Sequence, residues 1–302
     1  MRILKIEIYK EYNPDKKIRV NPIKEINNNL RNTDSMLRIL KNLKSTIMDE
    51  YISLLEKRLN REIKDYKLDT TNFSLGELGN AFVVLSDYCD LINVITSYTC
   101  KQLALPSSYQ FEIKEIMTTS LNYVKAGRRI RYHRLKAFIE ILGENEGIKL
   151  WKKLISLRLI EIRNESNNSN EKEQKLTSAE ASKLEIESWS NLGLADFVVA
   201  ILDEHRVLYR FDKCLFHEAF KDFKDPDVAY LASCYFADSP EFNKGRYRKV
   251  RRTQTLHHED YCDEFYWDKD VYCDPKQPPL EFTKKIGNVD PNELLDEYKE
   301  LL

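Results

Sequence analysis

The sequence predicts an α+β protein in which a helical N-terminal half is followed by a C-terminal antiparallel sheet with packed helices. Two observations carry this prediction. Through most of the first half, apolar residues recur at three- and four-residue steps, which is the spacing of amphipathic helices. In the C-terminal half, short apolar and aromatic runs alternate with turn residues, which is typical of antiparallel strands.

The chain begins with a strand pattern over residues 2–9, where Ile6 and Ile8 fall on one face. Turn residues follow at Asn13 and Pro14, and residues 18–20 supply a return strand. A short N-terminal β-hairpin is therefore predicted.

A series of helices is expected next. Ser74 and Glu77 form a capping box for the second of them, and Pro106 ends it. The expected helices cover residues 33–66, 74–106, 107–127, 128–142 and 146–160. Cys89 and Cys100 fall within these apolar patterns and are interpreted as small buried side chains.

The chain divides into a mainly helical region over 1–164, a polar linker or loop over 165–178 and an α+β catalytic-like domain over 179–302. Thr177 and Glu180 cap the helix that opens the last part. Further elements are a strand pair at 197–202 and 207–211, a helix at Cys214, a helix at 226–233, strands at 247–256 and 261–267, and a final helix from Asp290.

The composition limits the classes of function that are compatible with the sequence. The 302 residues include 48 basic and 49 acidic side chains, and this balance gives no general attraction to nucleic acid. No apolar run is long enough for a membrane span. The opening residues lack a secretory signal, and the six cysteines lack a framework spacing, so reduced thiols in the cytoplasm are expected.

The chemistry-bearing residues gather between residues 209 and 267, which contain three of the six cysteines and three of the five histidines. Cys214 and Glu218 are four apart in a helical pattern, so we expect them on one face. The run RRTQTL reads as a strand that places Thr253 and Thr255 together. Cys262 and Asp263 begin the last strand and point to opposite sides of it.

These residues resemble the L-2-amino-thiazoline-4-carboxylic acid hydrolase-like family. Its pattern is R-C-x-x-x-E, C-x-x-x-D, R-T-x-T and C-D-F. The corresponding positions here are Lys213-Cys214 with Glu218, Cys234 with Asp238, Arg252 to Thr255, and Cys262-Asp263. The chain departs from the pattern at Lys213, at His257 to Asp260, where the glycine-containing turn is expected, and at Glu264, which interrupts C-D-F.

The resemblance implies a hydrolase that acts on a non-peptide C–N bond of a small cyclic amidine carboxylate, as in the conversion of 2-amino-thiazoline-4-carboxylate to N-carbamoyl-cysteine. The implied nucleophile is Cys214 or a water held by Glu218. A carboxylate beside a thiol raises the thiol pKa and so opposes thiolate formation, which favours the water over Cys214 as the nucleophile. The other implied catalytic residues are His257 or His258, as acid or base, and Cys262. The implied substrate-binding residues are Arg252 with Thr253 and Thr255, as the carboxylate anchor, and Cys234 and Asp238.

Other interpretations remain open. The basic run from Lys244 to Arg252 is a candidate nucleic-acid patch, but a solvated strand balanced by nearby acids is favoured. Cysteine, histidine and glutamate are ligands that Zn²⁺ accepts, yet no Cys-x-x-Cys pair occurs, so no metal or cofactor is assigned. The alternatives to the hydrolase are another enzyme of sulfur-containing natural-product metabolism and a small-molecule or metal sensor without turnover. The oligomeric state is left open.

Overall fold

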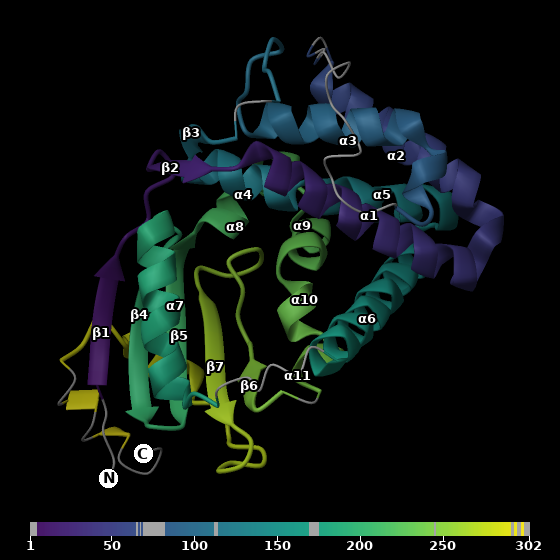
Figure 1. Ribbon diagram of the computed structural model, residues 1–302. Coiled ribbons are helices and arrows are strands. Elements are labelled where there is room, and N and C mark those ends of the chain that lie inside the picture. The colour runs from purple at the N-terminus through teal and green to yellow at the C-terminus, as the bar shows by residue number, and fades with distance from the viewer. Residues whose placement is uncertain are drawn as a thin grey trace.

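The computed structural model describes residues 5–64, 66, 68, 82–111, 114–168, 175–244, 246–290, 293–294 and 297–298. A five-stranded antiparallel sheet stands beside a layer of helices, with α6 running obliquely away from that layer (Figure 1). The predicted α+β class, with its helical first half, is confirmed. None of the helices in these ranges is long and apolar enough to cross a bilayer.

The sheet has the strand order β1-β4-β5-β7-β6, and every neighbouring pair is antiparallel. Its strands are β1 (Lys5–Lys10), β4 (Ala195–Asp203), β5 (Arg206–Cys214), β6 (Arg248–Arg251) and β7 (Cys262–Asp268). The hairpin of β4 and β5 confirms the predicted strand pair. The strand predicted over 247–256 forms only as β6, which ends at Arg251, so the rest of RRTQTL is not a strand.

The predicted N-terminal hairpin is wrong. β1 pairs with β4, and β2 (Lys17–Val20) pairs with β3 (Ile116–Thr119) in a separate two-stranded sheet. The turn between β1 and β2 does form, with Lys16 N donating to Asn13 O at 3.2 Å. Both strands nevertheless pair with distant segments. For β1, the stacking of Tyr9 on Phe197, with the ring centroids 4.9 Å apart, stabilises the pairing with β4.

The helical half contains α1 (Pro22–Lys44), α2 (Met48–Ile63), α3 (Cys89–Gln102), α4 (Ser120–Arg128), α5 (Ile130–Leu142) and α6 (Glu144–Asn168). A short 3-10 turn, η1 (Ser45–Ile47), interrupts the first predicted helix, and α1 begins at Pro22 because Asn21 caps it. The Ser74 capping box lies outside the described residues. The predicted helix over 107–127 begins too early: β3 precedes α4, and Thr119 caps that helix, which starts at Ser120.

The second half contains α7 (Ser178–Leu192), α8 (Leu215–Glu218), η4 (Lys221–Phe223), α9 (Pro226–Ser233), α10 (Tyr235–Asp238), α11 (Pro240–Asn243) and α12 (Leu280–Lys285). The capping box of Thr177 and Glu180 is present at α7, as predicted. The predicted linker is partly helical, because α6 continues to Asn168. The predicted helix at Cys214 is only α8, and Cys214 itself is extended and ends β5.

Both faces of the sheet are covered. On one face, Phe197, Tyr209 and Phe211 pack against Trp189 of α7. On the other, Val198, Leu208 and Phe265 pack against Phe282 and Ile286 of the α12 segment. Burial on both faces explains why β4 is apolar at nearly every position rather than at alternate ones.

The helical core reaches the end of this sheet. Leu194, just before β4, and Leu215, just after β5, belong to the same buried cluster as the helices of the first half. Phe220, just before η4, and Val228 of α9 extend that cluster. The sheet end that carries Cys214 is therefore held directly against the helical layer.

Candidate functional site

Three cysteines from separate elements meet at this end of the sheet. Cys214 ends β5, Cys234 follows α9 and Cys262 opens β7. Burial, together with the neighbouring thiols of Cys262 and Cys234, raises the pKa of Cys214 to about 12. Burial likewise raises the pKa of Cys262 to about 12, again with Cys234 adding to the shift. The three thiols thus form one cluster, and at neutral pH they are protonated. All six cysteines of the chain are free.

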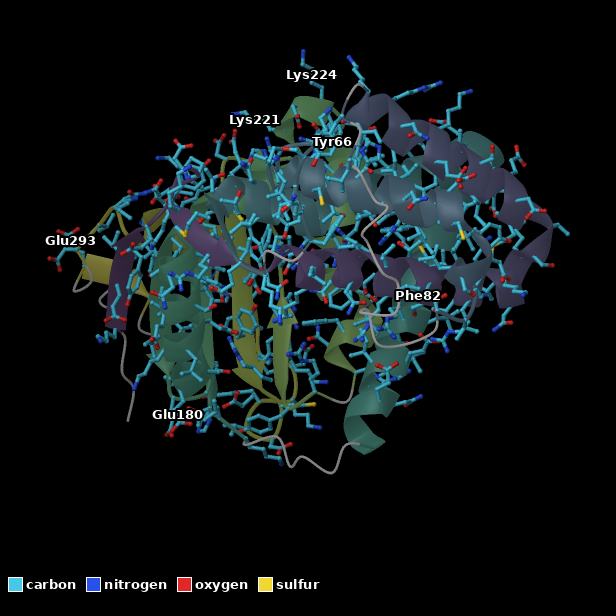
Figure 2. All side chains as sticks on the ribbon, turned by 45° about the horizontal axis from the view of Figure 1, so that its top comes forward. Tyr66, Phe82, Glu180, Lys221, Lys224 and Glu293 are labelled. Atoms are coloured by element: carbon cyan, nitrogen blue, oxygen red, sulfur yellow. The ribbon has the colours of Figure 1, made fainter. Side chains whose placement is uncertain are left out.

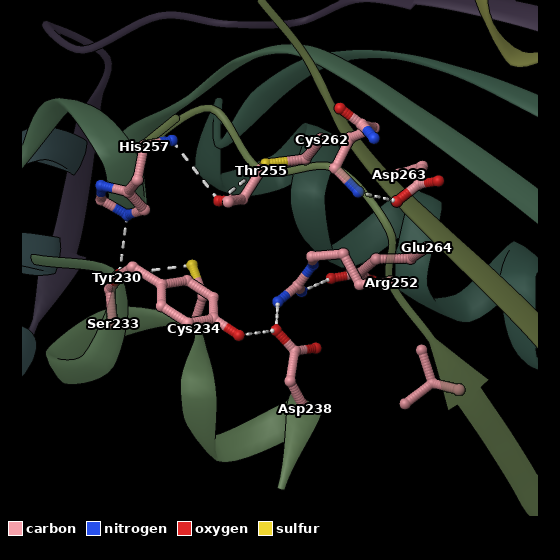
Figure 3. Close-up of polar contacts among 12 residues, drawn as sticks. Tyr230, Ser233, Cys234, Asp238, Arg252, Thr255, His257, Cys262, Asp263 and Glu264 are labelled. Atoms are coloured by element: carbon pink, nitrogen blue, oxygen red, sulfur yellow. Dashed lines mark hydrogen bonds and ion pairs between the residues drawn. The ribbon is translucent and has the colours of Figure 1, made fainter. Parts of the chain in front are cut away.

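Arg252 lies beside this cluster in a buried network of charges and hydroxyls (Figure 3). Its Nη1 donates to Asp238 Oδ2 at 2.7 Å, and its Nη2 donates to Glu264 Oε1. Tyr230 donates to the same oxygen of Asp238 at 2.9 Å, and Tyr266 donates to the second oxygen of Glu264 at 2.7 Å. The network joins α9, α10 and β7.

The two carboxylates occupy both terminal nitrogens of Arg252. Burial opposes its charge, but Glu264, Cys234 and Asp238 hold the Arg252 pKa well above its ordinary value. A substrate carboxylate would have to displace an internal partner to bind there. The geometry therefore gives Arg252 a structural role and does not favour the predicted anchoring role.

Thr253 and Asp263 form a second buried contact set. Asp263 Oδ1 accepts hydrogen bonds from the backbone N–H groups of Thr253 at 2.6 Å and Gln254 at 2.7 Å, and its other oxygen accepts one from the Thr253 hydroxyl. Asp263 is fully buried, and Gln277 also donates to it, at 3.2 Å. Thr253 is thus engaged in closing the loop between β6 and β7. As expected from strand alternation, Asp263 and Cys262 lie on opposite faces of β7.

Thr255 approaches the thiol cluster from the same loop. The Cys262 thiol lies 3.8 Å from Thr255 Oγ1 and accepts a hydrogen bond from Leu256 N at 3.0 Å. The Thr255 hydroxyl also accepts from His257 N at 3.4 Å. These contacts hold His257 in place next to the cysteines.

A chain of polar atoms connects Cys234 to His257 through Ser233. Ser233 Oγ lies 3.2 Å from Cys234 Sγ and 2.8 Å from His257 Nε2. Burial, together with the nearby His217, His258 and Arg252, lowers the pKa of His257 to about 3, so its ring is neutral at pH 7. Burial also raises the pKa of Cys234, but the Arg252 charge and the Ser233 hydroxyl act against that shift. Cys234 is thus the clustered thiol that has a proton path to an imidazole.

Glu218 and His258 lie at the periphery. Glu218 pairs with Lys221 at 3.7 Å in a half-exposed position on α8. The predicted shared helix face with Cys214 does not exist, because Cys214 belongs to β5. His258 Nε2 lies 2.9 Å from Asp227 Oδ1, and both side chains are exposed. The His258 ring meets the Tyr230 ring edge to face, with the centroids 5.7 Å apart.

A small pocket of about 90 Å³ opens beside His257. His217 lines it with His257, and the two rings meet edge to face with their centroids 5.2 Å apart. Lys221 and Lys224 line its outer part, and Figure 2 shows both lysines at the outer surface. The pocket beside His257 is therefore lined by two lysines and by Asp225.

The basic run from Lys244 to Arg252 is largely paired within the protein. Arg248 makes a double contact with Glu185, with both distances 2.7 Å, and Arg251 pairs with Asp274. With Arg252 also occupied, these contacts favour the paired-strand interpretation over a nucleic-acid patch. In the described ranges, no group of three or more His, Cys, Asp or Glu side chains is placed to hold a metal ion.

Sequence reasoning missed Ser233, His217 and Glu264. Side chains alternate along the strand that begins at Cys262, so Glu264 lies on the same face as Cys262. This alternation could have identified Glu264 as a site residue from the sequence. Ser233 and His217 carried no local signal, because only the packing of α9 and α8 against the loop after β6 brings them to His257. Comparison with protein-family models, curated proteins and solved structures found no match.

Proposed function

We propose that this protein is a hydrolase of small cyclic amidine carboxylates, of the 2-amino-thiazoline-4-carboxylate type. One observation carries the proposal. The residues of the family-like pattern are spread from Cys214 to Asp263 in the sequence, and yet Cys214, Cys234 and Cys262 lie together beside Arg252. Their common location supports one site with one chemistry.

Cys234 is the nucleophile in this proposal, because it alone among the three clustered thiols has a path to a base through Ser233. The Cys234 sulfur bonds to the amidine carbon while its proton passes by way of Ser233 to His257. The bond from that carbon to the ring sulfur breaks, and the departing sulfur takes up a proton, which leaves an isothiourea on Cys234. Water then adds to the same carbon and expels the Cys234 thiol.

Taken together, these steps convert one molecule of 2-amino-thiazoline-4-carboxylate and one water to N-carbamoyl-cysteine. For this substrate the ring bond that breaks is C–S, so the C–N bond expected from the family resemblance survives in the product. A thiol leaves more readily than an amine, because its ordinary pKa is near 8.5. The reaction therefore needs little help from an acid at the leaving group.

The test is to incubate the purified protein with 2-amino-thiazoline-4-carboxylate and to measure N-carbamoyl-cysteine by mass spectrometry. Cys234→Ser should lower the rate by about a hundredfold or more, because a hydroxyl is a far weaker nucleophile here. Cys273→Ser, at an exposed thiol outside the cluster, is the matched control and should keep full activity. Absence of product with the unaltered protein would overturn the proposal.

A further inference from the structure

A cavity of about 310 Å³ lies between α1, α4 and the segment that leads into β4. Tyr123 and Phe216 contribute aromatic side chains to its lining, and Asn28 and Asn32 contribute amides from exposed positions on α1. The cavity borders the thiol cluster, because Phe216 follows Cys214 by two residues. Nothing in the function proposed above uses it.

Two arginines in the lining make no ion pair among the described residues, although Glu25 attracts one of them, Arg128, electrostatically. Arg128 ends α4 and Arg131 lies in the first turn of α5, and neither side chain makes a hydrogen bond or ion pair with any residue among the described ranges. Arg128 lies over the Phe216 ring at 4.9 Å from its centroid. Arg131 also lines a second cavity of about 150 Å³, together with Asn32 and Arg134.

Arg134 adds a third guanidinium on the same stripe, one further turn along α5. It donates to Asn29 O at 3.0 Å and to the Thr33 hydroxyl, which are uncharged partners. Burial lowers the pKa of Arg131 well below its ordinary value, and Arg128 and Arg134 lower it further. Among the described residues that line the larger cavity, Glu25 is the one acid, and burial raises its pKa.

Guanidinium groups withdrawn from water without a counter-ion are costly to the folded state, and mutual repulsion adds to that cost. A bound anion would remove both penalties at once. The planar guanidinium donates two parallel hydrogen bonds, which match the two oxygens of a carboxylate. The aromatic part of the lining suits a flat organic ligand rather than a bare inorganic ion.

We infer that this cavity binds a small, flat organic carboxylate, with its carboxylate held by Arg128 and Arg131 and its ring beside Tyr123 and Phe216. Arg128 interacts electrostatically with Cys234 and Cys214, so a ligand held there lies next to the thiols. The identification of this ligand with the substrate rests on the proposed function. In that role Arg128 and Arg131 replace Arg252 as the carboxylate anchor.

The test uses a probe that cannot be turned over, 2-aminothiazole-4-carboxylate, and its neutral carboxamide as the matched ligand. Isothermal titration calorimetry should show that the carboxylate binds at least about tenfold more tightly than the amide. Arg131→Gln should weaken carboxylate binding by about tenfold or more. Arg19→Gln removes a positive charge at a 73% exposed side chain on β2 and should bind like the unaltered protein.

Asn32→Asp gives a second, independent variant. It places a carboxylate from an exposed position on α1 at the same cavity, where it competes for Arg131 and should also weaken binding about tenfold. Because Asn32 is exposed, this variant keeps the test decisive if Arg131→Gln fails to fold. Unchanged carboxylate affinity in a folded Arg131→Gln and in Asn32→Asp overturns the inference, as does equal binding of the amide by the unaltered protein.

Turnover separates this inference from the proposed function. If the protein hydrolyses 2-amino-thiazoline-4-carboxylate but its affinity for the carboxylate probe does not depend on Arg131, the anchoring role of Arg131 is wrong and the proposed hydrolase function stands. If the protein binds the probe in a way that depends on Arg131 but does not hydrolyse 2-amino-thiazoline-4-carboxylate, the anion site is supported and the proposed hydrolase function is wrong.

Discussion

Arg252 and Asp238 form a buried ion pair, with Nη1 and Oδ2 2.7 Å apart and the two side chains only 8% and 17% exposed. Glu264 completes the arrangement on the other terminal nitrogen of Arg252. The guanidinium thus holds α10 against β7, and its loss would leave two carboxylates without their shared cation.

Arg252→Met should therefore destabilise the fold strongly. Breaking a buried ion pair by removing one partner typically costs about 3–5 kcal/mol of unfolding free energy. Arg251→Met is the matched control, because the Asp274 partner of Arg251 is 76% exposed, and it should cost no more than about 1 kcal/mol. Urea denaturation measures both. Equal losses in the two variants would argue against the structural role of Arg252.

Glu218→Gln should leave turnover of 2-amino-thiazoline-4-carboxylate within about a factor of three of the unaltered rate, whereas Cys234→Ser nearly abolishes it. The reason is that Glu218 pairs with Lys221 at the surface of α8, while Cys234 lies in the cluster. Steady-state kinetics on both variants checks this. A loss in Glu218→Gln as large as in Cys234→Ser would restore the alternative of a water held by Glu218.

Thiol reactivity should divide the cysteines into two classes. Cys89, which the apolar pattern predicted to be buried, is exposed, as is Cys273, and both should react with a disulfide reagent first at pH 7. The clustered thiols and Cys100 should react slowly, because burial raises the pKa of Cys100, Cys214 and Cys262 to about 12. Mass spectrometry of peptides after brief labelling identifies the sites. Labelling of Cys214 ahead of Cys89 would contradict the buried, protonated cluster.

Acid should destabilise the protein through His133 and His257. Burial lowers the folded-state pKa of both to about 3, below the ordinary value of 6.5. The unfolded chain therefore binds protons first as the pH falls, so the stability that these rings contribute is complete above pH 6.5 and is lost toward pH 3. Each ring contributes up to about 1.4 kcal/mol per pH unit in that window.

The measurement is urea denaturation of the unaltered protein and of the double variant His133→Gln with His257→Gln, across that range of pH. The double variant should lose much of the acid-dependent slope. His258→Gln, at an exposed ring, is the control and should keep it. An unchanged slope in the double variant would assign acid sensitivity to other groups.

The sequence by itself determined the elements whose signals are local. The capping box of Thr177 and Glu180, the proline that opens α9 and the apolar pattern of β4 and β5 were all readable, because caps, proline and side-chain period act over a few residues. The α+β class followed from them. The gathering of cysteines and charged side chains toward the C-terminal end was readable as well.

Only the tertiary structure decided which partners these elements take. The strand pattern around Ile6 and Ile8 was visible, but its neighbour is β4, almost two hundred residues away, and no local pattern encodes that distance. Arg252 looked like a free anchor until folding brought Asp238 and Glu264 to it. The sequence did not show that Arg131 lacks an ion pair. The spacing of residues along a helix is visible in the sequence, but the charge that faces a given residue is not. Long-range packing settles such questions, since it alone fixes which charges share a buried space.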